Sequence, residues 1–189
     1  ACADYVLSKN SGNTVSNLSS TRALRDITEA AGGQYFASAV GEVNVVAKMK
    51  EKQAVIGGEG NGGIIDPNLH YGRDALVGVA LFLSLLAQRK CSVSVLKASY
   101  PQYYMSKGKI ALDASLDVDA LLAQMEHNYQ ADQPLTIDGL KIDFPEGWVH
   151  MRKSNTEPII RVYAEAGTQE QADALTQRFS SELLAIAGQ

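Results

Sequence analysis

Residues 152–158 hold the densest cluster of charged and hydrogen-bonding groups in the chain, reading Arg-Lys-Ser-Asn-Thr-Glu-Pro. A tight loop of this composition exposes backbone N–H groups, adds short side-chain donors, and brings a planar arginine cation beside them. Arg161 lies on the following predicted strand and adds a second positive charge if its side chain points toward the loop. The candidate phosphate ligands are Arg152, Ser154, Asn155, Thr156 and Arg161. Such a set suits a phosphate dianion, although the same residue types build ordinary polar turns, an interpretation that composition alone favours slightly.

A second cluster, residues 57–63, reads Gly-Gly-Glu-Gly-Asn-Gly-Gly. Glycine lets a ligand approach the backbone closely, while the carboxylate of Glu59 and the amide of Asn61 project from the loop. A carboxylate accepts hydrogen bonds from two neighbouring hydroxyls, which is a way to hold a sugar ring. The run lacks the Lys-Ser/Thr ending of a P-loop and does not open a helix, so a nucleotide site is excluded. A flexible loop that uses glycine only for sharp turns is an equally open interpretation.

The overall charge limits the partners of this protein. Its 189 residues carry 17 Lys and Arg against 21 Asp and Glu, a formal net charge of −4. An acidic chain has little electrostatic attraction for nucleic acid, so any anion site must be local. The longest apolar stretch, residues 75–87, is shorter than the roughly 18 residues that a membrane span needs. We therefore expect neither a nucleic-acid partner nor a membrane partner.

The cysteines and histidines give no sign of a metal centre. Cys2 and Cys91 form neither a disulfide framework nor a zinc-like spacing, which favours a reducing, cytoplasmic setting. His70, His127 and His150 are scattered, without a partner at a spacing typical of a metal site or a catalytic triad. The sequence therefore predicts no metal ligand in this chain.

The first half of the chain alternates short apolar runs with helical patterns, which is typical of a layered α/β unit. Ser19 or Ser20 is expected to cap one helix, and Asp74 to cap a long helix that reaches about residue 90. Strands are expected near residues 14–18, 34–40 and 54–56, and the last of these runs directly into the glycine-rich loop. We predict an α/β domain over residues 1–98, a layered mixed sheet with helices, with this loop at the carboxyl end of a strand.

The pattern changes after residue 98, where a linker leads into an extended segment. Asp117 is expected to cap an amphipathic helix, and Asp138-Gly139 to turn a hairpin. Two further strands are expected at residues 148–151 and 159–166, before a closing helix. We predict a smaller α+β domain over residues 99–189, a mostly antiparallel sheet with two helices.

Three segments together resemble the α-D-phosphohexomutase superfamily, which includes phosphoglucomutase, phosphomannomutase and phosphoglucosamine mutase. They are residues 58–62 (Gly-Glu-Gly-Asn-Gly), residues 71–76 (Tyr-Gly-Arg-Asp-Ala-Leu) and residues 152–158. The resemblance covers nearly the whole chain, and the order and separation of the two loops match the last two of the family's four domains. Within the superfamily the chain is most similar to bacterial phosphoglucosamine mutase or phosphomannomutase-like members.

The resemblance implies that this chain is a C-terminal fragment of a phosphohexomutase that binds substrate during interconversion of hexose 1- and 6-phosphates. It implies that Glu59 and Asn61 hold sugar hydroxyls. It also implies that the non-transferred phosphate is held by Arg152, Ser154, Asn155 and Thr156, with help from Arg161. The sugar must bind in two orientations, so that either phosphate faces the catalytic serine while the other is held. Many members carry Ser and His where this chain has Asn61 and Gly63, so the preferred hexose stays open.

Two motifs of the family are absent from this sequence: the phosphorylated Ser-His-Asn-Pro loop and the Asp-Gly-Asp-x-Asp-Arg loop that binds Mg²⁺. Both belong to earlier domains of the family. Without them, phosphoryl transfer has neither its nucleophile nor its main electrostatic stabiliser. We expect no catalytic residue and no bound cofactor in this chain, and no turnover by the chain alone. Its expected partners are a hexose or hexosamine phosphate and the missing N-terminal domains.

Two other interpretations are open. The chain can be a free-standing, non-catalytic phosphosugar-binding module that reuses these domains. It can also be a purely structural α/β protein whose loops bind nothing. Binding of phosphosugars separates the last interpretation from the other two.

Overall fold

The computed structural model describes residues 1–111, 116–154, 157 and 159–188. The chain divides into two compact units, Ala1–Gln102 and Tyr103–Gln189, and each is described by itself. The sequence pattern places the change between domains after residue 98, and the contacts divide the chain after Gln102. None of the helices within the described ranges is long and apolar enough to cross a membrane.

Unit 1 is built on a four-stranded mixed sheet. Its strands are β1 (Thr14–Asn17), β2 (Tyr35–Ser38), β3 (Ile56–Gly58) and β4 (Ile64–Ile65). The order is β2-β1-β3-β4, with the first three strands parallel and β4 antiparallel to β3. The carboxyl ends of the three parallel strands therefore meet at one edge of the sheet, and the glycine-rich loop begins there.

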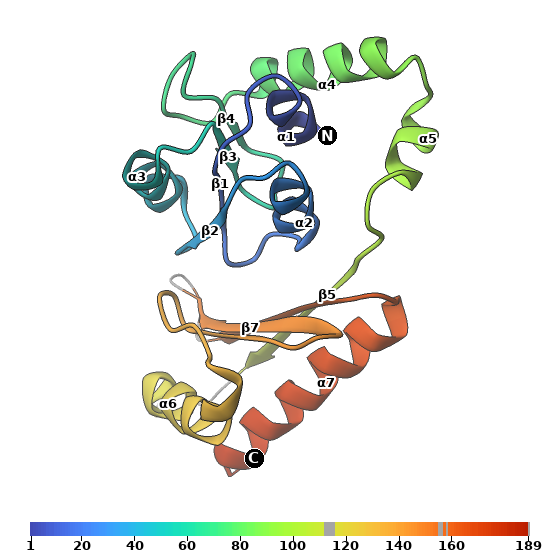
Figure 1. Ribbon diagram of the computed structural model, residues 1–189. Coiled ribbons are helices and arrows are strands. Elements are labelled where there is room, and N and C mark those ends of the chain that lie inside the picture. The colour runs from blue at the N-terminus through green and yellow to red at the C-terminus, as the bar shows by residue number, and fades with distance from the viewer. Residues whose placement is uncertain (112–115, 155–156, 158, 189) are drawn as a thin grey trace. The chain divides into compact units, whose positions relative to one another are not determined.

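The helices of unit 1 lie on both sides of this sheet (Figure 1). They are α1 (Cys2–Leu7), α2 (Ala23–Ala30), α3 (Glu42–Lys52), α4 (Ala75–Arg89) and α5 (Val93–Ala98). Helix α3 buries Val45 and Met49 against the sheet residues Val15 and Ile65. A Cβ on Gly57 would lie 2.3 Å from the sulfur of Met49, so α3 packs this closely only because residue 57 has no side chain.

Of the two helix caps predicted in unit 1, one is confirmed and one is wrong. Asp74 caps α4 as predicted, since its side chain accepts hydrogen bonds from the backbone of Leu76 and Val77. The predicted cap by Ser19 or Ser20 is wrong, because α2 begins after Arg22 and has no side-chain cap. The Ser20 hydroxyl instead donates to the side chain of Asn17 at the end of β1, 2.9 Å away.

Unit 2 is an antiparallel sheet with helices. The strands are β5 (Tyr104–Ala111), β6 (Leu140–Asp143), β7 (Gly147–Lys153) and β8 (Ile159–Ala166), in the order β5-β8-β7-β6. The helices are α6 (Val118–Asn128), a short 3₁₀ turn (Gln130–Asp132) and α7 (Gln169–Ile186). Asp117 caps α6 as predicted. The predicted fold class, an α/β unit followed by an α+β unit, is confirmed.

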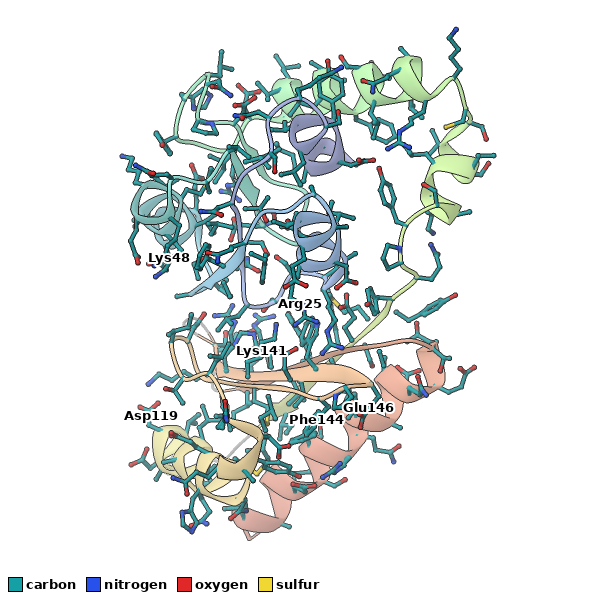
Figure 2. All side chains as sticks on the ribbon, viewed as in Figure 1. Arg25, Lys48, Asp119, Lys141, Phe144 and Glu146 are labelled. Carbon is teal, nitrogen blue, oxygen red and sulfur yellow. The ribbon has the colours of Figure 1, made fainter. Side chains whose placement is uncertain are left out.

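The sheet of unit 2 has one apolar side and one polar side. Side chains at alternate strand positions, among them Met151, Ile160 and Val162, form the core with α6 and α7. Phe144 packs against Phe179 of α7 in that core. On the other side, the ammonium of Lys141 lies 4.3 Å from the centre of the Trp148 ring. Figure 2 shows Lys141 and Phe144 on opposite sides of this sheet.

Candidate functional site

Glu59 lies at the carboxyl edge of the parallel sheet in unit 1. It directly follows β3, while Asn17 ends β1 and Gly41 follows β2. In sheets of this kind, ligands bind outside the carboxyl ends of the strands. The topology therefore brings together three segments that are far apart in the sequence, at the edge where a ligand site is expected.

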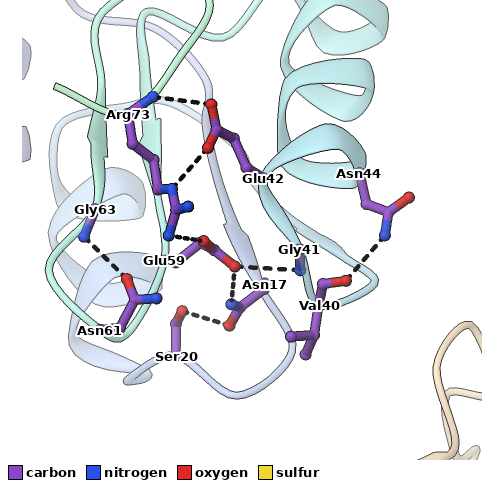
Figure 3. Close-up of polar contacts among 10 residues, drawn as sticks. All are labelled: Asn17, Ser20, Val40, Gly41, Glu42, Asn44, Glu59, Asn61, Gly63 and Arg73. Carbon is purple, nitrogen blue, oxygen red and sulfur yellow. Dashed lines mark hydrogen bonds and ion pairs between the residues drawn. The ribbon is translucent and has the colours of Figure 1, made fainter. Parts of the chain in front are cut away.

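The carboxylate of Glu59 is held by groups from the ends of the other two parallel strands and by Arg73, which precedes α4 (Figure 3). Its Oε1 accepts hydrogen bonds from Nδ2 of Asn17 at 3.0 Å and from the backbone N–H of Gly41 at 3.1 Å. Its Oε2 lies 3.2 Å from a guanidinium nitrogen of Arg73. The Glu59 side chain is only 5% exposed. Burial of a carboxylate is tolerated here because hydrogen bonds and a cation compensate its charge.

Arg73 joins Glu59 to the first turn of α3. Its Nε donates to Glu42 at 2.7 Å, and its backbone N–H donates to the same carboxylate at 3.1 Å (Figure 3). These hydrogen bonds hold the pKa of Glu42 below its ordinary value. Arg73 is thus shared between two carboxylates, and it fixes the position of the glycine-rich loop relative to α3.

Asn61 has a different role within the same loop. Its Oδ1 accepts a hydrogen bond from the backbone N–H of Gly63 at 3.0 Å, which closes a local turn. Its amide nitrogen donates to no group among the described residues. A Cβ on Gly63 would lie 2.4 Å from Cδ of Arg73, so this glycine leaves room for the arginine stem.

Glu59 and Asn61 line different hollows of unit 1. Glu59 borders a small cavity of about 120 Å³ beside Ser16 and Ser20. Asn61 borders an open cavity of about 530 Å³ together with Glu42 and Arg73. The second cavity has the size of common small-molecule sites. The structure thus places both residues in one loop without bringing them to a single cavity.

In unit 2 the described candidate phosphate ligands, Arg152, Ser154 and Arg161, lie on or next to strands β7 and β8. Arg152 and Arg161 are directly opposite each other in the register of these two strands. Nη2 of Arg161 is 3.5 Å from the hydroxyl of Ser154 and 3.4 Å from the carboxylate of Glu157. The backbone N–H of Ser154 donates to the carbonyl of Ile159 at 2.9 Å, which holds this serine at the end of the hairpin. The structure thus brings both arginines and the serine together.

Arg152 is only loosely compensated. Its nearest carboxylate oxygen among the described residues, from Asp138, is 4.0 Å away, and its Nε has no hydrogen-bond partner there. Asn155 and Thr156, the other two predicted phosphate ligands, lie outside the described residues. The roles assigned to all of these residues stay predictions at this point.

The two units match the models of one known family. Residues 1–104 match alpha/beta/alpha domain III of phosphoglucomutase/phosphomannomutase, and residues 109–182 match the C-terminal domain of the same enzymes. The chain belongs to the phosphoglucomutase/phosphomannomutase family. The predicted membership, with the third and fourth domains only, is confirmed.

Individual members of the phosphoglucomutase/phosphomannomutase family support this assignment. The chain is 35% identical over 176 residues to a phosphoglucomutase/phosphomannomutase of Thermococcus kodakarensis, covering 90% of this chain and 38% of that protein. A family protein from Burkholderia thailandensis has a similar structure, with a TM-score of 0.76 at 26% identity, covering 97% of this chain and 40% of that one. This chain therefore spans about two fifths of the length of these relatives.

A more distant member shares the fold. The N-acetylphosphoglucosamine mutase of Aspergillus fumigatus, solved in complex with GlcNAc-6P and magnesium, has a TM-score of 0.65 at 16% identity. The structural match covers 100% of this chain and 43% of the Aspergillus fumigatus chain.

No group of three or more Asp, Glu, His or Cys side chains that could hold a metal ion occurs within the described parts of our chain.

Sequence reasoning missed several residues of the unit 1 network as site residues. Asn17, Gly41, Glu42 and Arg73 contact Glu59 directly or through one another. Arg73 lies within residues 71–76, one of the segments that carry the resemblance to the phosphohexomutases, and this resemblance is the signal that points to it. The spacing along the chain does not relate Asn17 to Glu59, because the ends of β1 and β3 come together only in the parallel sheet.

Proposed function

We propose that this chain is the C-terminal part of a phosphohexomutase, in which unit 1 recognises sugar hydroxyls and unit 2 recognises a phosphate group. The substrate is a hexose or hexosamine phosphate, which the parent enzyme interconverts between its 1- and 6-phosphates. Unit 1 takes the sugar hydroxyls with Glu59 and Asn61. The phosphate that is not transferred is held by Arg152, Ser154, Asn155, Thr156 and Arg161.

The observation that carries this proposal is that Arg152 and Arg161 are partners in the strand register of β7 and β8. The two cations lie directly opposite each other on neighbouring strands, beside a loop rich in hydrogen-bond donors. Like charges in directly opposite positions destabilise a sheet. A dianion between the two guanidinium groups reverses this effect, since each guanidinium binds phosphate oxygens with two N–H groups. A polar turn without a ligand has no need of this arrangement.

The contacts of Glu59 and Asn61 support the sugar-binding role. Three donors already engage the Glu59 carboxylate, which has about four acceptor positions, so one position remains for a hydroxyl. The Asn61 amide nitrogen is an available donor beside the larger cavity. One acceptor and one donor on the same loop suit the hydroxyl groups of a sugar better than they suit an anion.

The chemistry of the parent enzyme requires groups that this chain lacks. In the proposed parent, Mg²⁺ and a phosphorylated serine supply the electrostatic stabilisation and the phosphoryl group, and both motifs are absent from this sequence. The described residues of this chain bind and orient the sugar and its distal phosphate. We infer that the chain alone has no mutase turnover.

The coverage of the relatives supports a fragment over a free-standing binding module. The matched relatives are more than twice as long as this chain, and their names describe whole mutases. The hexose preference stays open, because both loops address features that glucose, mannose and glucosamine phosphates share.

A titration of the chain with phosphosugars tests the proposal. Glucosamine 6-phosphate and glucose 1-phosphate are added to the protein while amide NMR shifts are followed, with unphosphorylated glucose and ATP as comparison ligands. We expect saturable phosphosugar binding that Arg152→Ala weakens by about tenfold or more, since a hydrogen bond to a charged group contributes about 1.5–3 kcal/mol.

Lys153→Ala is the matched control for this titration. It removes the same charge at the next position, but the ammonium of Lys153 is paired with Asp119 at 2.7 Å. The control should bind phosphosugars as the unmodified chain does. Equal weakening by both variants, or no binding of any phosphosugar at millimolar concentration, would contradict the proposed site. Mutase turnover by the purified chain would contradict the assignment of catalysis to the parent.

A further inference from the structure

A third cation lies in the same row of the unit 2 sheet as the two arginines. The register of β5 and β8 places Lys109 directly opposite Arg161, which is itself directly opposite Arg152 on β7. Directly opposite residues in an antiparallel pair have Cβ atoms about 4.5–5.5 Å apart on the same side of the sheet. Lys109, Arg161 and Arg152 therefore form one line across three strands, which we call the cation row.

The alternation along the strands shows which side of the sheet carries the cation row. The neighbours Ile110 and Ile160 belong to the core with the helices. Lys107, two positions before Lys109 on the same side of β5, places its ammonium 5.5 Å from the centre of the Tyr163 ring of β8. Lys109 is thus on the polar side of the sheet, and it is exposed.

The negative charge near the cation row is small. Glu157 lies 3.4 Å from Arg161, and Asp138 lies 4.0 Å from Arg152. The Lys109 side chain makes no hydrogen bond or ion pair with any described residue. Three adjacent cations with only two long carboxylate contacts repel one another, and such a row is stabilised when an anion binds to it. In a chain of net charge −4, this local excess of positive charge is a specific feature.

We infer that Lys109 is a further binding residue for the phosphate dianion, on the side of Arg161 away from Arg152. This inference rests on the proposed phosphate site. A lysine ammonium is a compact charge on a flexible stem, whereas a guanidinium is a planar group of fixed geometry. Lys109 therefore attracts the phosphate without imposing a hydrogen-bond geometry on it. Its flexible side chain can reach the phosphate in either of the two substrate orientations, while the two arginines fix the position of the site.

The test measures phosphate binding and unfolding of the full chain, with inorganic phosphate as the probe at pH 8 and low ionic strength. Lys109→Gln should weaken phosphate binding by about 3- to 10-fold, as expected for one partly screened charge–charge contact. Without phosphate, the same variant should be as stable as the unmodified chain or more stable, because one repulsive charge is gone. Its melting temperature should then rise less when phosphate is added.

Lys107→Gln is the matched control, since it removes the same charge from the same side of the same strand, outside the cation row. It should change phosphate binding by less than about twofold, because Lys107 lies opposite Tyr163 and not opposite Arg161, so its ammonium is farther from the phosphate and the Coulomb attraction is weaker. Equal weakening by the two variants would mean that only the general charge of the sheet matters, and it would overturn the role of Lys109.

Arg152→Ala separates failure of this inference from failure of the proposed function. If Arg152→Ala abolishes phosphate binding while Lys109→Gln leaves it unchanged, the phosphate site stands and Lys109 does not belong to it. If Arg152→Ala also has no effect, phosphate binds elsewhere and both proposals fail. A Lys109→Gln variant that is less stable without phosphate would likewise contradict the inference, because it would make Lys109 a structural residue.

Discussion

The glycine-rich loop of unit 1 and the hairpin of unit 2 compensate their charges in opposite ways. The Glu59 carboxylate is nearly buried and is engaged by an amide, a backbone N–H and a guanidinium. The cation row Lys109–Arg161–Arg152 has carboxylates no closer than 3.4 Å among the residues that the structure describes. One region is internally satisfied, while the other carries an excess of charge.

This difference is the one expected from the proposed roles, sugar hydroxyls for unit 1 and a phosphate group for unit 2. Hydroxyl groups are neutral, so their recognition depends on donors and acceptors that are already held in position. A phosphate dianion supplies its own charge, so its site can remain under-compensated until the ligand binds. The first region should therefore contribute to the stability of its unit, and the second should contribute to binding.

The largest expected effect is on unit 1. Glu59→Ala should lower the free energy of unfolding of unit 1 by roughly 2–3 kcal/mol, because the Asn17 amide, the Gly41 N–H and the Arg73 guanidinium lose their shared acceptor. Urea unfolding followed by amide NMR signals of each unit measures this loss, and the signals of unit 2 should keep their midpoint. Glu51→Ala, which removes an exposed carboxylate of α3, is the control and should have little effect. An unchanged unit 1 would contradict the structural role of the network.

A smaller effect is expected from acid, first in unit 2. Burial lowers the pKa of His150 to about 4, whereas an unfolded histidine has a pKa of about 6.5. Its contribution to stability is therefore complete above pH 6.5 and is lost as the pH falls toward 4. Between pH 7 and pH 5, unit 2 should lose roughly 1–2 kcal/mol, which urea unfolding at each pH measures.

Two comparisons test whether His150 causes this loss of stability in acid. In unit 1 the carboxyl groups of Glu42 and Asp74 have lowered pKa values, so their contribution persists until the pH falls below about 4. His150→Gln should remove the loss in unit 2 between pH 7 and pH 5, and His127→Gln, at an exposed position of α6, should leave it in place. A loss that survives His150→Gln would assign the titration to another group.

The smallest expected effect is that of Arg161→Gln on stability. The contact of Arg161 with Glu157 is long and partly exposed, and the substitution also relieves repulsion within the cation row. The free energy of unfolding of unit 2 should therefore change by less than about 0.5 kcal/mol, measured by urea unfolding without phosphate. A loss above about 1 kcal/mol would make Arg161 a structural residue and would remove the contrast between the two regions.

The parts of the fold that were predicted from the sequence depend on local patterns. Asp74 and Asp117 cap the helices that follow them, because capping involves residues two or three positions apart. The glycine-rich loop follows a parallel strand, as the apolar run before it indicates. The predicted cap by Ser19 or Ser20 was wrong because α2 begins at Ala23, with Arg22 at the N-cap position, so neither serine is next to its first turn.

The sequence by itself determined the family, the two fold classes, and the residue types available for chemistry, since periodicity and motif spacing are local properties of the chain. Only the tertiary structure decided which of these residues meet. Arg73 and Glu42 are 31 positions apart, and packing of α3 against the sheet brings them into contact. Lys109 joins Arg161 and Arg152 because the strand register aligns them, and a shift of one residue would turn a side chain to the other side of the sheet.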